Sequence, residues 1–320
     1  MTFNQSPPVL ATHSGKFHCD DVFAYATLRL ALGLEAPGED HVLLRTRDAD
    51  RIAAADIVWD VGSVFDAETN RFDHHQRGAP RRPDGTPYSS AGLIWQVYGA
   101  RAVAKLLGGR GAEAFAATIA ADLDADMVRR IDEIDTGVSV RGPVTRESLD
   151  LAALVGDFNP SWDHPAANGP TAGDDAFVAA TALVEGVLRR RVDENRARLE
   201  AEALVLAAHR SGADPRILVL ERGMPWKGAV FTHDLPVLFT VSPASNGKWM
   251  VDAVPPEPNS FAQRLPLPEA WAGLQGDELA AASGVADAVF VHLRRFVGGA
   301  ASREGAIALA QRALELGSPI

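Results

Sequence analysis

The first part of the chain alternates between short apolar runs and segments whose apolar residues have helical spacing. The apolar runs at 9–12, 41–46 and 57–59 predict strands, and the segments at 22–32 and 51–55 predict helices between them. A continuous apolar run is typical of a strand that is covered on both faces. The order strand, helix, strand, helix, strand predicts an α/β fold with a parallel sheet and right-handed crossovers.

The pattern then becomes mainly helical. A loop rich in proline, glycine and arginine spans 78–88, and helical spacing predicts helices at 89–107, 112–130 and 175–210. Between 156 and 174 the composition shifts to Asn, Pro, Trp and Gly, which is typical of a boundary. We therefore expect a first domain at 1–165, a connecting helical segment at 166–210 and a second domain at 211–320.

The last third of the chain has the pattern of apolar runs and turns that is typical of a second sheet. Strand-like runs separated by turns occur at 217–220, 230–232, 237–241, 249–251 and 288–293. After the last run, Gly298-Gly299 is expected to form a loop ahead of a terminal helix. This pattern predicts a smaller α+β domain whose sheet is at least partly antiparallel.

The composition limits which binding partners and which cellular compartment are expected for the protein. The 320 residues carry a formal net charge of -11, so a nucleic-acid substrate would need a local basic patch or metal ions. The single cysteine, Cys19, allows no internal disulfide and suits a reducing cytosol. We find no membrane-spanning run and no signal or transit segment, so we expect a cytoplasmic protein without a membrane partner. Composition predicts no particular oligomeric state.

Histidine and aspartate gather in four clusters within the first half of the chain. The candidate residues are His13, His18, Asp20, Asp60, Asp73, His74, His75 and Asp135. Several of them fall just after predicted strands, where parallel sheets bind their ligands. Imidazole and carboxylate together suit Mn²⁺, Zn²⁺ or Fe²⁺ better than Ca²⁺ or Mg²⁺. The clusters therefore predict a site for more than one metal ion.

Asp60 ends a predicted strand amid these clusters and is well placed to bridge two ions. Two divalent ions ~3.5–4 Å apart are a common device for phosphoryl transfer, in which they activate water and stabilise the attacking and leaving oxygens. His18 and Asp20 are two residues apart, so in an extended segment they would point the same way. We expect Cys19 to be a packed or incidental thiol, with a soft metal ligand as the alternative. The other histidines are expected to be ordinary core or surface residues, namely His41, His164 and His209.

Together these clusters resemble the DHH phosphoesterase superfamily. The closer resemblance is to the melanocyte-proliferating-gene family of DHH-like exonucleases, also labelled metal-dependent protein hydrolases. In one place the chain departs from the superfamily, because the spacing from His13 is one residue longer and His18 stands where the first aspartate would be. Further matching stretches extend over nearly the whole chain, at 88–93, 159–162, 264–266, 271–274, 290–292 and 298–299.

The resemblance implies a DHH-type first domain that holds two divalent ions, with Mn²⁺ as the first choice. One ion would be bound by His13, His18 and Asp60. The other would be bound by Asp20, Asp60, His74 and Asp135. His75 would face the phosphate and act with Asp60 in catalysis. The second domain would bind the substrate through Arg264, His292, Gly298 and Gly299.

The leading hypothesis is a two-metal phosphodiesterase that acts as a 3′→5′ exonuclease on RNA or short oligonucleotides, with metal-activated water attacking phosphorus. A small-nucleotide phosphodiesterase or a pyrophosphatase would use the same chemistry on another substrate. A third hypothesis is a regulatory module that binds metal and nucleotide without turnover. The peptidase label has no support from a His-Glu-x-x-His motif, which does not occur in the chain.

Overall fold

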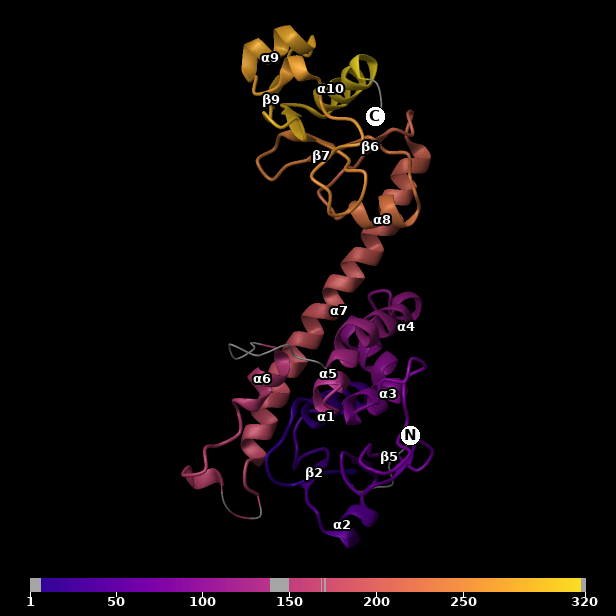
Figure 1. Ribbon diagram of the computed structural model, residues 1–320, viewed down its shortest axis with the longest axis vertical. Coiled ribbons are helices and arrows are strands. Elements are labelled where there is room, and N and C mark those ends of the chain that lie inside the picture. Colours follow the sequence, from indigo (N-terminus) through magenta and orange to yellow (C-terminus); the bar gives the residue numbers. More distant parts are fainter. Residues whose placement is uncertain (1–6, 139–149, 168, 170, 318–320) are drawn as a thin grey trace. The chain divides into compact units, whose positions relative to one another are not determined.

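The chain divides into two compact units, Met1–Arg196 and Ala197–Ile320. The computed structural model describes residues 7–138, 150–167, 169 and 171–317 (Figure 1). Each unit contains one five-stranded sheet together with helices, so the fold is mixed α/β as predicted. Helix α7 (Asp174–Ser211) begins in the first unit and ends in the second. The predicted domain bounds at 165 and 211 stay a prediction. Within the described ranges, no helix is long and apolar enough to cross a membrane.

The first sheet has the strand order β2-β1-β3-β5-β4. Its strands are β1 Val9–Thr12, β2 Val42–Arg45, β3 Ile57–Trp59, β4 Phe65–Asp66 and β5 Arg71–Phe72. β1 pairs in parallel with β2 and β3, and β3 pairs in parallel with β5, whereas the edge strand β4 runs antiparallel to β5. The predicted parallel sheet is thus confirmed apart from this edge, and the carboxyl ends of its strands meet on one side.

The helices of the first unit pack around α1 (Cys19–Leu32) and α3 (Ser90–Leu107), which contact each other closely. Residues 19–28 of α1 are all buried, so this helix lies in the core. It ends at Gly33, whose φ of 72° is a left-handed value that glycine adopts without a Cβ clash. The shorter helical elements are α2 Ala49–Ala54, α6 Leu151–Gly156 and a 3₁₀ turn Pro165–Ala167.

The chain after α3 is less regular than its pattern predicts. Instead of one helix at 112–130, it forms α4 (Ala112–Leu123), a π-helical turn (Asp124–Val128) and α5 (Arg129–Asp135). Asp124, the first residue of the π turn, accepts hydrogen bonds of 2.6 and 2.8 Å from Arg82. A π turn shifts the helical register locally, and apolar spacing alone does not reveal it. The helix therefore continues to Asp135 rather than ending at 130.

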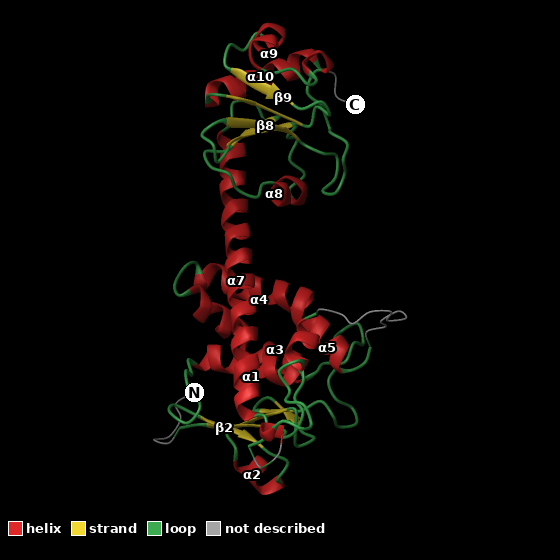
Figure 2. Cartoon of the chain, turned by 90° about the vertical axis from the view of Figure 1, so that its left-hand side faces the viewer, coloured by secondary structure: helices red, strands yellow, loops and turns green. Residues whose placement is uncertain are grey.

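The second sheet has the strand order β6-β7-β8-β10-β9 and is mostly antiparallel, with only β6 and β7 parallel. Its strands are β6 Ile217–Val219, β7 Phe239–Pro243, β8 Trp249–Ala253, β9 Ala288–Val291 and β10 Val297–Ala300. Alternate residues face two apolar cores, as Ile217 and Leu218 do. One core includes α9 (Gly276–Ser283) and α10 (Arg303–Leu316), which Figure 2 shows beside the sheet. A 3₁₀ turn spans Glu269–Trp271.

Two expectations for this unit are wrong. The run 230–232 belongs to helix α8 (Lys227–Thr232), because burial of Val230 in the second apolar core outweighs the strand preference of its neighbours. Gly298 and Gly299 form no loop but lie buried within β10. A Cβ on Gly299 would come within 2.9 Å of the Trp249 carbonyl oxygen, so glycine is needed where the strands approach closely.

Candidate metal centre

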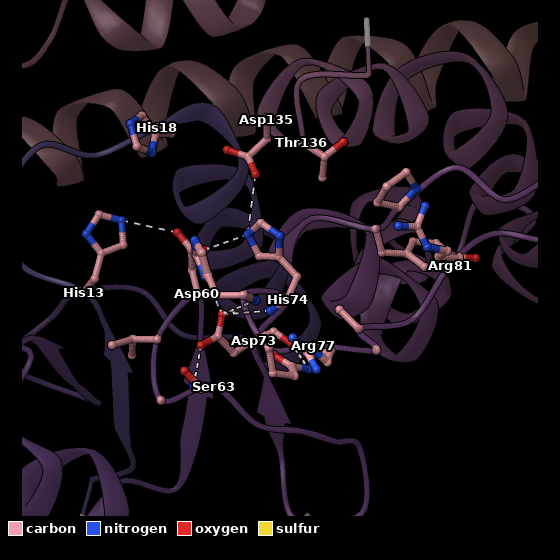
Figure 3. A pocket seen from close by; sticks show the side chains of 18 of the residues that line it. His13, His18, Asp60, Ser63, Asp73, His74, Arg77, Arg81, Asp135 and Thr136 are labelled. Atoms are coloured by element: carbon pink, nitrogen blue, oxygen red, sulfur yellow. Dashed lines mark hydrogen bonds and ion pairs between the residues drawn. The ribbon is translucent and has the colours of Figure 1, made fainter.

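The carboxyl ends of the parallel strands bring the predicted ligands to one side of the first sheet (Figure 3). His13 follows β1 directly, Asp60 follows β3, and His74 comes shortly after β5. Asp20 lies in the first turn of α1, and Asp135 is the last residue of α5. The fold therefore joins side chains that are far apart in the chain.

Asp60 occupies the centre of this arrangement. Its backbone has a φ of 55°, which is uncommon for a residue other than glycine. Its Oδ2 lies 3.2 Å from His13 Nε2, and its Oδ1 lies 3.0 Å from His74 Nε2. Because its two oxygens face two different histidines, Asp60 belongs to two separate groups of potential metal ligands.

The first group contains Asp21 in addition to His13 and Asp60, and the ligand atoms of all three lie within 4.8 Å of one another. Asp21 Oδ2 lies 3.1 Å from His13 Nε2, while its Oδ1 accepts a 3.0 Å hydrogen bond from the His18 backbone N–H. One carboxylate thus faces the group and also caps the start of α1.

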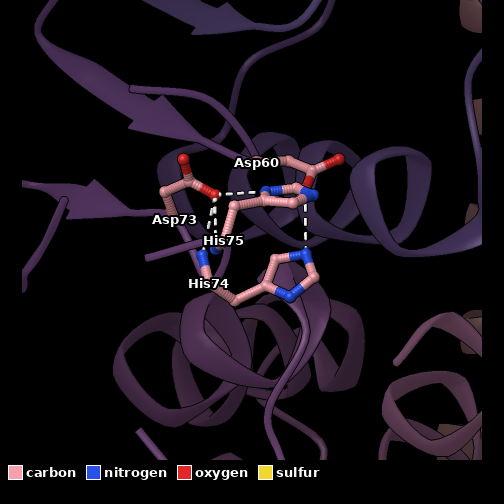
Figure 4. Close-up of side chains that lie close together, drawn as sticks. All are labelled: Asp60, Asp73, His74 and His75. Carbon is pink, nitrogen blue, oxygen red and sulfur yellow. Dashed lines mark hydrogen bonds and ion pairs between the residues drawn. The ribbon is translucent and has the colours of Figure 1, made fainter. Parts of the chain in front are cut away.

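The second group forms around Asp73, which is almost fully buried (Figure 4). Its Oδ1 accepts hydrogen bonds from the backbone N–H groups of His74 and His75, at 2.7 and 3.2 Å, and lies 2.7 Å from His75 Nδ1. Its Oδ2 accepts a 2.5 Å hydrogen bond from the Ser63 N–H. Asp73 therefore fixes both histidines and ties them to the loop that carries Asp60.

The third group consists of His18, Asp20 and Asp135, whose ligand atoms also lie within 4.8 Å of one another. The expectation that His18 and Asp20 share an extended segment is wrong, because α1 begins at Cys19. Asp20 Oδ2 accepts a 2.8 Å hydrogen bond from the Ser90 hydroxyl, whereas Oδ1 is buried without a hydrogen-bond partner in the described part of the chain. Asp135 Oδ2 lies 3.4 Å from His74 Nε2, which connects this group to the second.

The loop that carries His18 is held by a side chain from much later in the chain. Asn159 Oδ1 accepts a hydrogen bond from the Phe17 N–H, and Asn159 Nδ2 donates one to the Phe17 carbonyl, both at 2.9 Å. This pairing resembles one rung of a strand ladder and fixes the backbone next to His18. It gives the Asn-Pro-Ser-Trp stretch at 159–162 a definite structural role.

The two buried histidines of the centre are strongly basic. Burial acts to lower the pKa of His13, but hydrogen bonds with Asp21 and Asp60 outweigh it and raise that pKa to about 10. For His74, burial is likewise outweighed by the hydrogen bond with Asp60 and the charge of Asp20, and its pKa rises to about 9. Asp60 shows the reciprocal effect, because its histidine partners overcome burial and lower its pKa to about 2.

The other acids of the centre are poorly compensated. Burial raises the pKa of Asp21 to about 7, although its hydrogen bond with His13 acts in the opposite direction. Burial and the charge of Asp20 raise the pKa of Asp135 to about 8. Burial and the charge of Asp60 raise the pKa of Asp20 as well. The protein thus gathers more buried carboxylates than its own cations neutralise.

This surplus fits divalent metal ions. An ion would compensate the acids and provide a partner for the unpaired Asp20 Oδ1, and imidazole with carboxylate is a donor set for Mn²⁺, Fe²⁺ or Zn²⁺. His13 and His74 have to lose their protons to bind a metal, and their carboxylate neighbours orient the rings for it. The centre can therefore hold metal ions, and Asp60 belongs to two of its three ligand groups in the described residues.

The groups open into a hollow of about 890 Å³. Four cationic side chains line it, namely Lys16, Arg47, Arg77 and Arg81. None of the four forms an ion pair with a carboxylate in the ranges that the structure describes. The side chain of His75 is 59% exposed and also lines the hollow. The site thus combines buried acids with cations that no carboxylate of the described residues neutralises, which suits an anionic ligand.

In the second unit, the predicted substrate residues do not share one environment. Arg264 Nη1 donates to the carbonyl oxygens of Leu235 and Val237, at 2.7 and 3.0 Å, so its guanidinium is engaged in holding a loop. His292 is exposed in the turn between β9 and β10. Gly298 and Gly299 are buried in the sheet, as described above. Their role in substrate binding stays a prediction.

The expectations for the remaining residues are borne out where the structure gives their contacts. His41 is fully buried, with Nε2 2.5 Å from the Tyr25 hydroxyl and Nδ1 2.6 Å from Asp40 Oδ1, as for an ordinary core histidine. His209 Nε2 lies 3.1 Å from the Pro215 carbonyl oxygen near the surface. Cys19 is a buried free thiol outside the three ligand groups found in the described ranges.

The sequence analysis missed several residues of the site. Asp21 adjoins the predicted ligand Asp20, and only the register of α1 shows that both are fully buried and serve different groups. Arg77 follows the histidine pair with only Gln76 between them, so its position in the motif could have identified it as a residue of the site. Arg47 and Arg81 come from loops, and no local pattern predicts that they line the same hollow.

Comparison with known proteins agrees with the resemblance. Residues 9–314 match the model of the MYG1 exonuclease family, described as "Uncharacterised protein family (UPF0160)". The chain is 35% identical to the human protein named MYG1 exonuclease, over 97% of this chain and 86% of that protein. It is 36% identical to MYG1 protein C27H6.8 of Caenorhabditis elegans, over 97% of this chain and 96% of that protein.

A more distant relative aligns over a similar extent. MYG1 protein YER156C of Saccharomyces cerevisiae is 30% identical, over 95% of this chain and 95% of that protein. No solved structure matches the chain. Because the family model and these relatives cover nearly all of the sequence, the chain belongs to the MYG1 family.

Proposed function

We propose that this protein is a metal-dependent phosphodiesterase that removes nucleotides from the 3′ end of RNA or short oligonucleotides. It would use two divalent ions, with Mn²⁺ as the first choice. The observation that carries the proposal is the position of Asp60, whose two oxygens lie 3.2 and 3.0 Å from two different histidines. The name of several relatives, MYG1 exonuclease, supports the choice of reaction and of nucleic acid as the substrate.

His13, Asp21 and Asp60 would hold one ion. The other would lie among Asp60, His74, Asp20 and Asp135, with His18 next to Asp20 and Asp135. Bound there, the ions would supply Lewis acidity to a phosphoryl oxygen and allow water to act as a nucleophile at neutral pH.

His75 is suited to contact the substrate rather than a metal ion. Its Nδ1 lies 2.7 Å from Asp73 Oδ1, so the carboxylate orients the ring and accepts its Nδ1–H. The side chain is 59% exposed, and Nε2, which is an acceptor in this neutral tautomer, can donate to the phosphate or the leaving oxygen once it has taken up a proton. The arginines that line the hollow can hold phosphate oxygens with paired hydrogen bonds.

The test is an activity panel with purified full-length protein and Mn²⁺, using RNA labelled at its 5′ end, single-stranded DNA, dinucleotides and pyrophosphate. We expect a ladder of progressively shorter labelled RNA products, which chelation of the metal abolishes. Cleavage of pyrophosphate alone would replace the proposal with a pyrophosphatase, and cleavage of dinucleotides alone with a small-nucleotide phosphodiesterase. Nucleotide binding without cleavage of any substrate would support the third hypothesis, a regulatory module that binds metal and nucleotide without turnover.

A further inference from the structure

The second unit contains a hollow of its own, of about 820 Å³, that the metal chemistry does not explain. It lies between the loop after β8, at 255–263, and the turn between β9 and β10, at 292–296. We call it the cationic hollow and define it by Lys227, Phe261, Leu293, Arg294, Arg295 and Phe296, which all line it.

Large apolar side chains are exposed at this hollow. Phe261 is 92% exposed, Leu293 is 72% exposed and Phe296 is 41% exposed. Exposing such side chains is unfavourable, and several of them around one concave surface mark an interaction site more often than scattered single residues do. The Phe296 ring packs against His292, with ring centroids 4.6 Å apart, so it is held in place while one side remains accessible.

The charge of the hollow is opposite to that of the chain. Its lining includes Lys227, Arg294 and Arg295 but no carboxylate, although the whole protein has a formal net charge of -11. None of the three cations is ion-paired with an acid in the described residues. Asp252 senses the charge of Lys227 but does not line the hollow. The site thus presents uncompensated positive charge to an anionic ligand.

Arg295 adds an independent observation. Its φ is 59°, in the left-handed region that favours glycine or asparagine. Among the described residues, its side chain makes only a long hydrogen bond, 3.4 Å from Nη1 to the Leu267 carbonyl oxygen. The turn between β9 and β10 explains this conformation, because the Arg295 N–H donates to the His292 carbonyl oxygen at 2.7 Å and the Arg295 carbonyl oxygen accepts from the Leu267 N–H at 3.0 Å. The fold thus fixes the backbone and leaves the guanidinium available to a ligand.

We propose that the cationic hollow binds single-stranded nucleic acid. Bases would stack on Phe261 and Phe296, and the phosphates between them would contact Lys227, Arg294 and Arg295. This combination of aromatic platforms and free cations is tolerant of sequence, because every base has a face that can stack. The inference rests on the proposed function for its choice of ligand and adds a binding site within the second unit.

Two other occupants explain the observations less well. An acidic peptide would satisfy the cations but would leave the phenylalanine rings without partners. A second copy of the chain could cover the rings, but a symmetric contact would bring the uncompensated cations of both copies together. Nucleic acid accounts for both features.

The test measures binding of a 5′-labelled uridine 12-mer to the full-length protein by fluorescence anisotropy, with Ca²⁺ present at a fixed salt concentration. We expect Phe261→Ala and Arg294→Ala each to weaken binding about tenfold. Leu316→Ala and Arg222→Ala, which replace an exposed apolar and an exposed cationic residue elsewhere in this unit, should bind like the wild type. Wild-type affinity in the Phe261 and Arg294 variants would overturn the proposal.

Two further outcomes would also overturn it. One is equal competition by polyglutamate, which would assign the hollow to acidic peptides. The other is a wild-type dimer that Phe261→Ala dissociates, which would make this face an interface between copies. Failure of the proposed function is separate, because it would appear as intact RNA in the Mn²⁺ activity panel while the anisotropy differences persisted.

Arg295→Gly separates binding from folding. Glycine adopts the observed φ without strain, so the melting temperature of this variant should equal or exceed that of the wild type. Its affinity for the uridine 12-mer should nevertheless fall several-fold, because one phosphate contact is lost. A lower melting temperature together with unchanged affinity would show that Arg295 is a structural residue and would remove it from the site.

Discussion

Two buried acidic centres lie side by side in the first unit, and consecutive residues at the start of α3 contact both. The hydroxyl and the backbone N–H of Ser89 donate to Asp132, at 2.7 and 3.0 Å. The hydroxyl of the next residue, Ser90, donates to Asp20 at 2.8 Å. Both aspartates are completely buried, so they differ in their partners and not in their exposure.

The Asp132 centre is complete within the protein. Its Oδ1 also accepts from the Gly92 N–H, and its Oδ2 accepts from Arg82 Nε and Nη2 at 3.1 and 2.7 Å. The Asp20 centre has an unpartnered oxygen and neighbouring carboxylates instead of a guanidinium. Burial of an acid is therefore no sign of a metal site by itself. Incomplete compensation, next to histidines that can lose protons, is the informative feature.

Of the substitutions that test this difference between the Asp20 and Asp132 centres, Asp60→Asn should have the largest effect. The substitution keeps the volume but removes the charge that the two histidines share, so metal occupancy and RNA cleavage should fall together, with activity more than about 100-fold lower. Elemental analysis and the 5′-labelled RNA assay measure the two effects. Asp157→Asn, on an exposed residue of the same unit, is the matched control. Full metal content in the Asp60 variant would refute the shared-ligand assignment.

Arg82→Ala should have the opposite effect, lowering the stability of the protein without lowering its metal content. It removes the guanidinium that neutralises Asp132 and Asp124, and breaking a buried ion pair costs about 3–5 kcal/mol in the free energy of unfolding. The metal content of the folded fraction should stay unchanged. Urea unfolding and elemental analysis test this, with Arg81→Ala as a neighbouring exposed control for stability. Loss of metal at unchanged stability would show that the two centres are one.

The sequence predicted the part of the site that local patterns encode. His13 and Asp60 directly follow apolar strands, and His74 belongs to a motif of adjacent acid and histidines, so their meeting follows from the parallel sheet. The roles of Asp20 and Asp21 were not separable, because they depend on where α1 begins. Arg47 and Arg81 of the metal-centre hollow could not be predicted, since loops that are distant in sequence bring them together.

The second unit shows a different limit of prediction from sequence, which concerns secondary structure. A glycine pair is compatible with a loop and with close approach of strands, and only the contacts of β10 distinguish the two. In the same way, Val230 favours a strand by its local preference, but the apolar core places it in the short helix α8. Local preference is weak evidence where burial decides the outcome.

Asp21→Asn sharpens the contrast within the metal centre. Asparagine can still accept the hydrogen bond of the His18 N–H, so the start of α1 should be preserved. Loss of the charge beside His13 should weaken Mn²⁺ affinity about 10–100-fold, which competition with a metal-binding dye can measure. Asp50→Asn, also an acid in the first turn of a helix, is the control. Unchanged Mn²⁺ affinity in the Asp21 variant would show that Asp21 only caps helix α1 and does not bind the metal.

Asp252 on β8 gives the smallest expected effect, because it is a half-buried acid outside the metal-ligand groups of the described residues. Burial raises its pKa to about 6, and the charge of Lys227 opposes this only partly. An acid whose folded-state pKa exceeds the unfolded value binds its proton more tightly when folded. The stability of the protein should therefore fall as the pH rises from about 4 to about 6, and the full cost should persist at higher pH.

Asp252→Asn removes this ionisation. The pKa difference corresponds to at most about 3 kcal/mol, and because asparagine also buries polar atoms, we expect a gain of about 1 kcal/mol at pH 8 and none at pH 4. Urea unfolding at the two pH values measures the difference. Added Mn²⁺ should stabilise variant and wild type equally, since Asp252 takes no part in metal binding. A variant that is less stable at pH 8 would mean that the ionised carboxylate has a stabilising partner, which would place Asp252 with Asp132 rather than with Asp20.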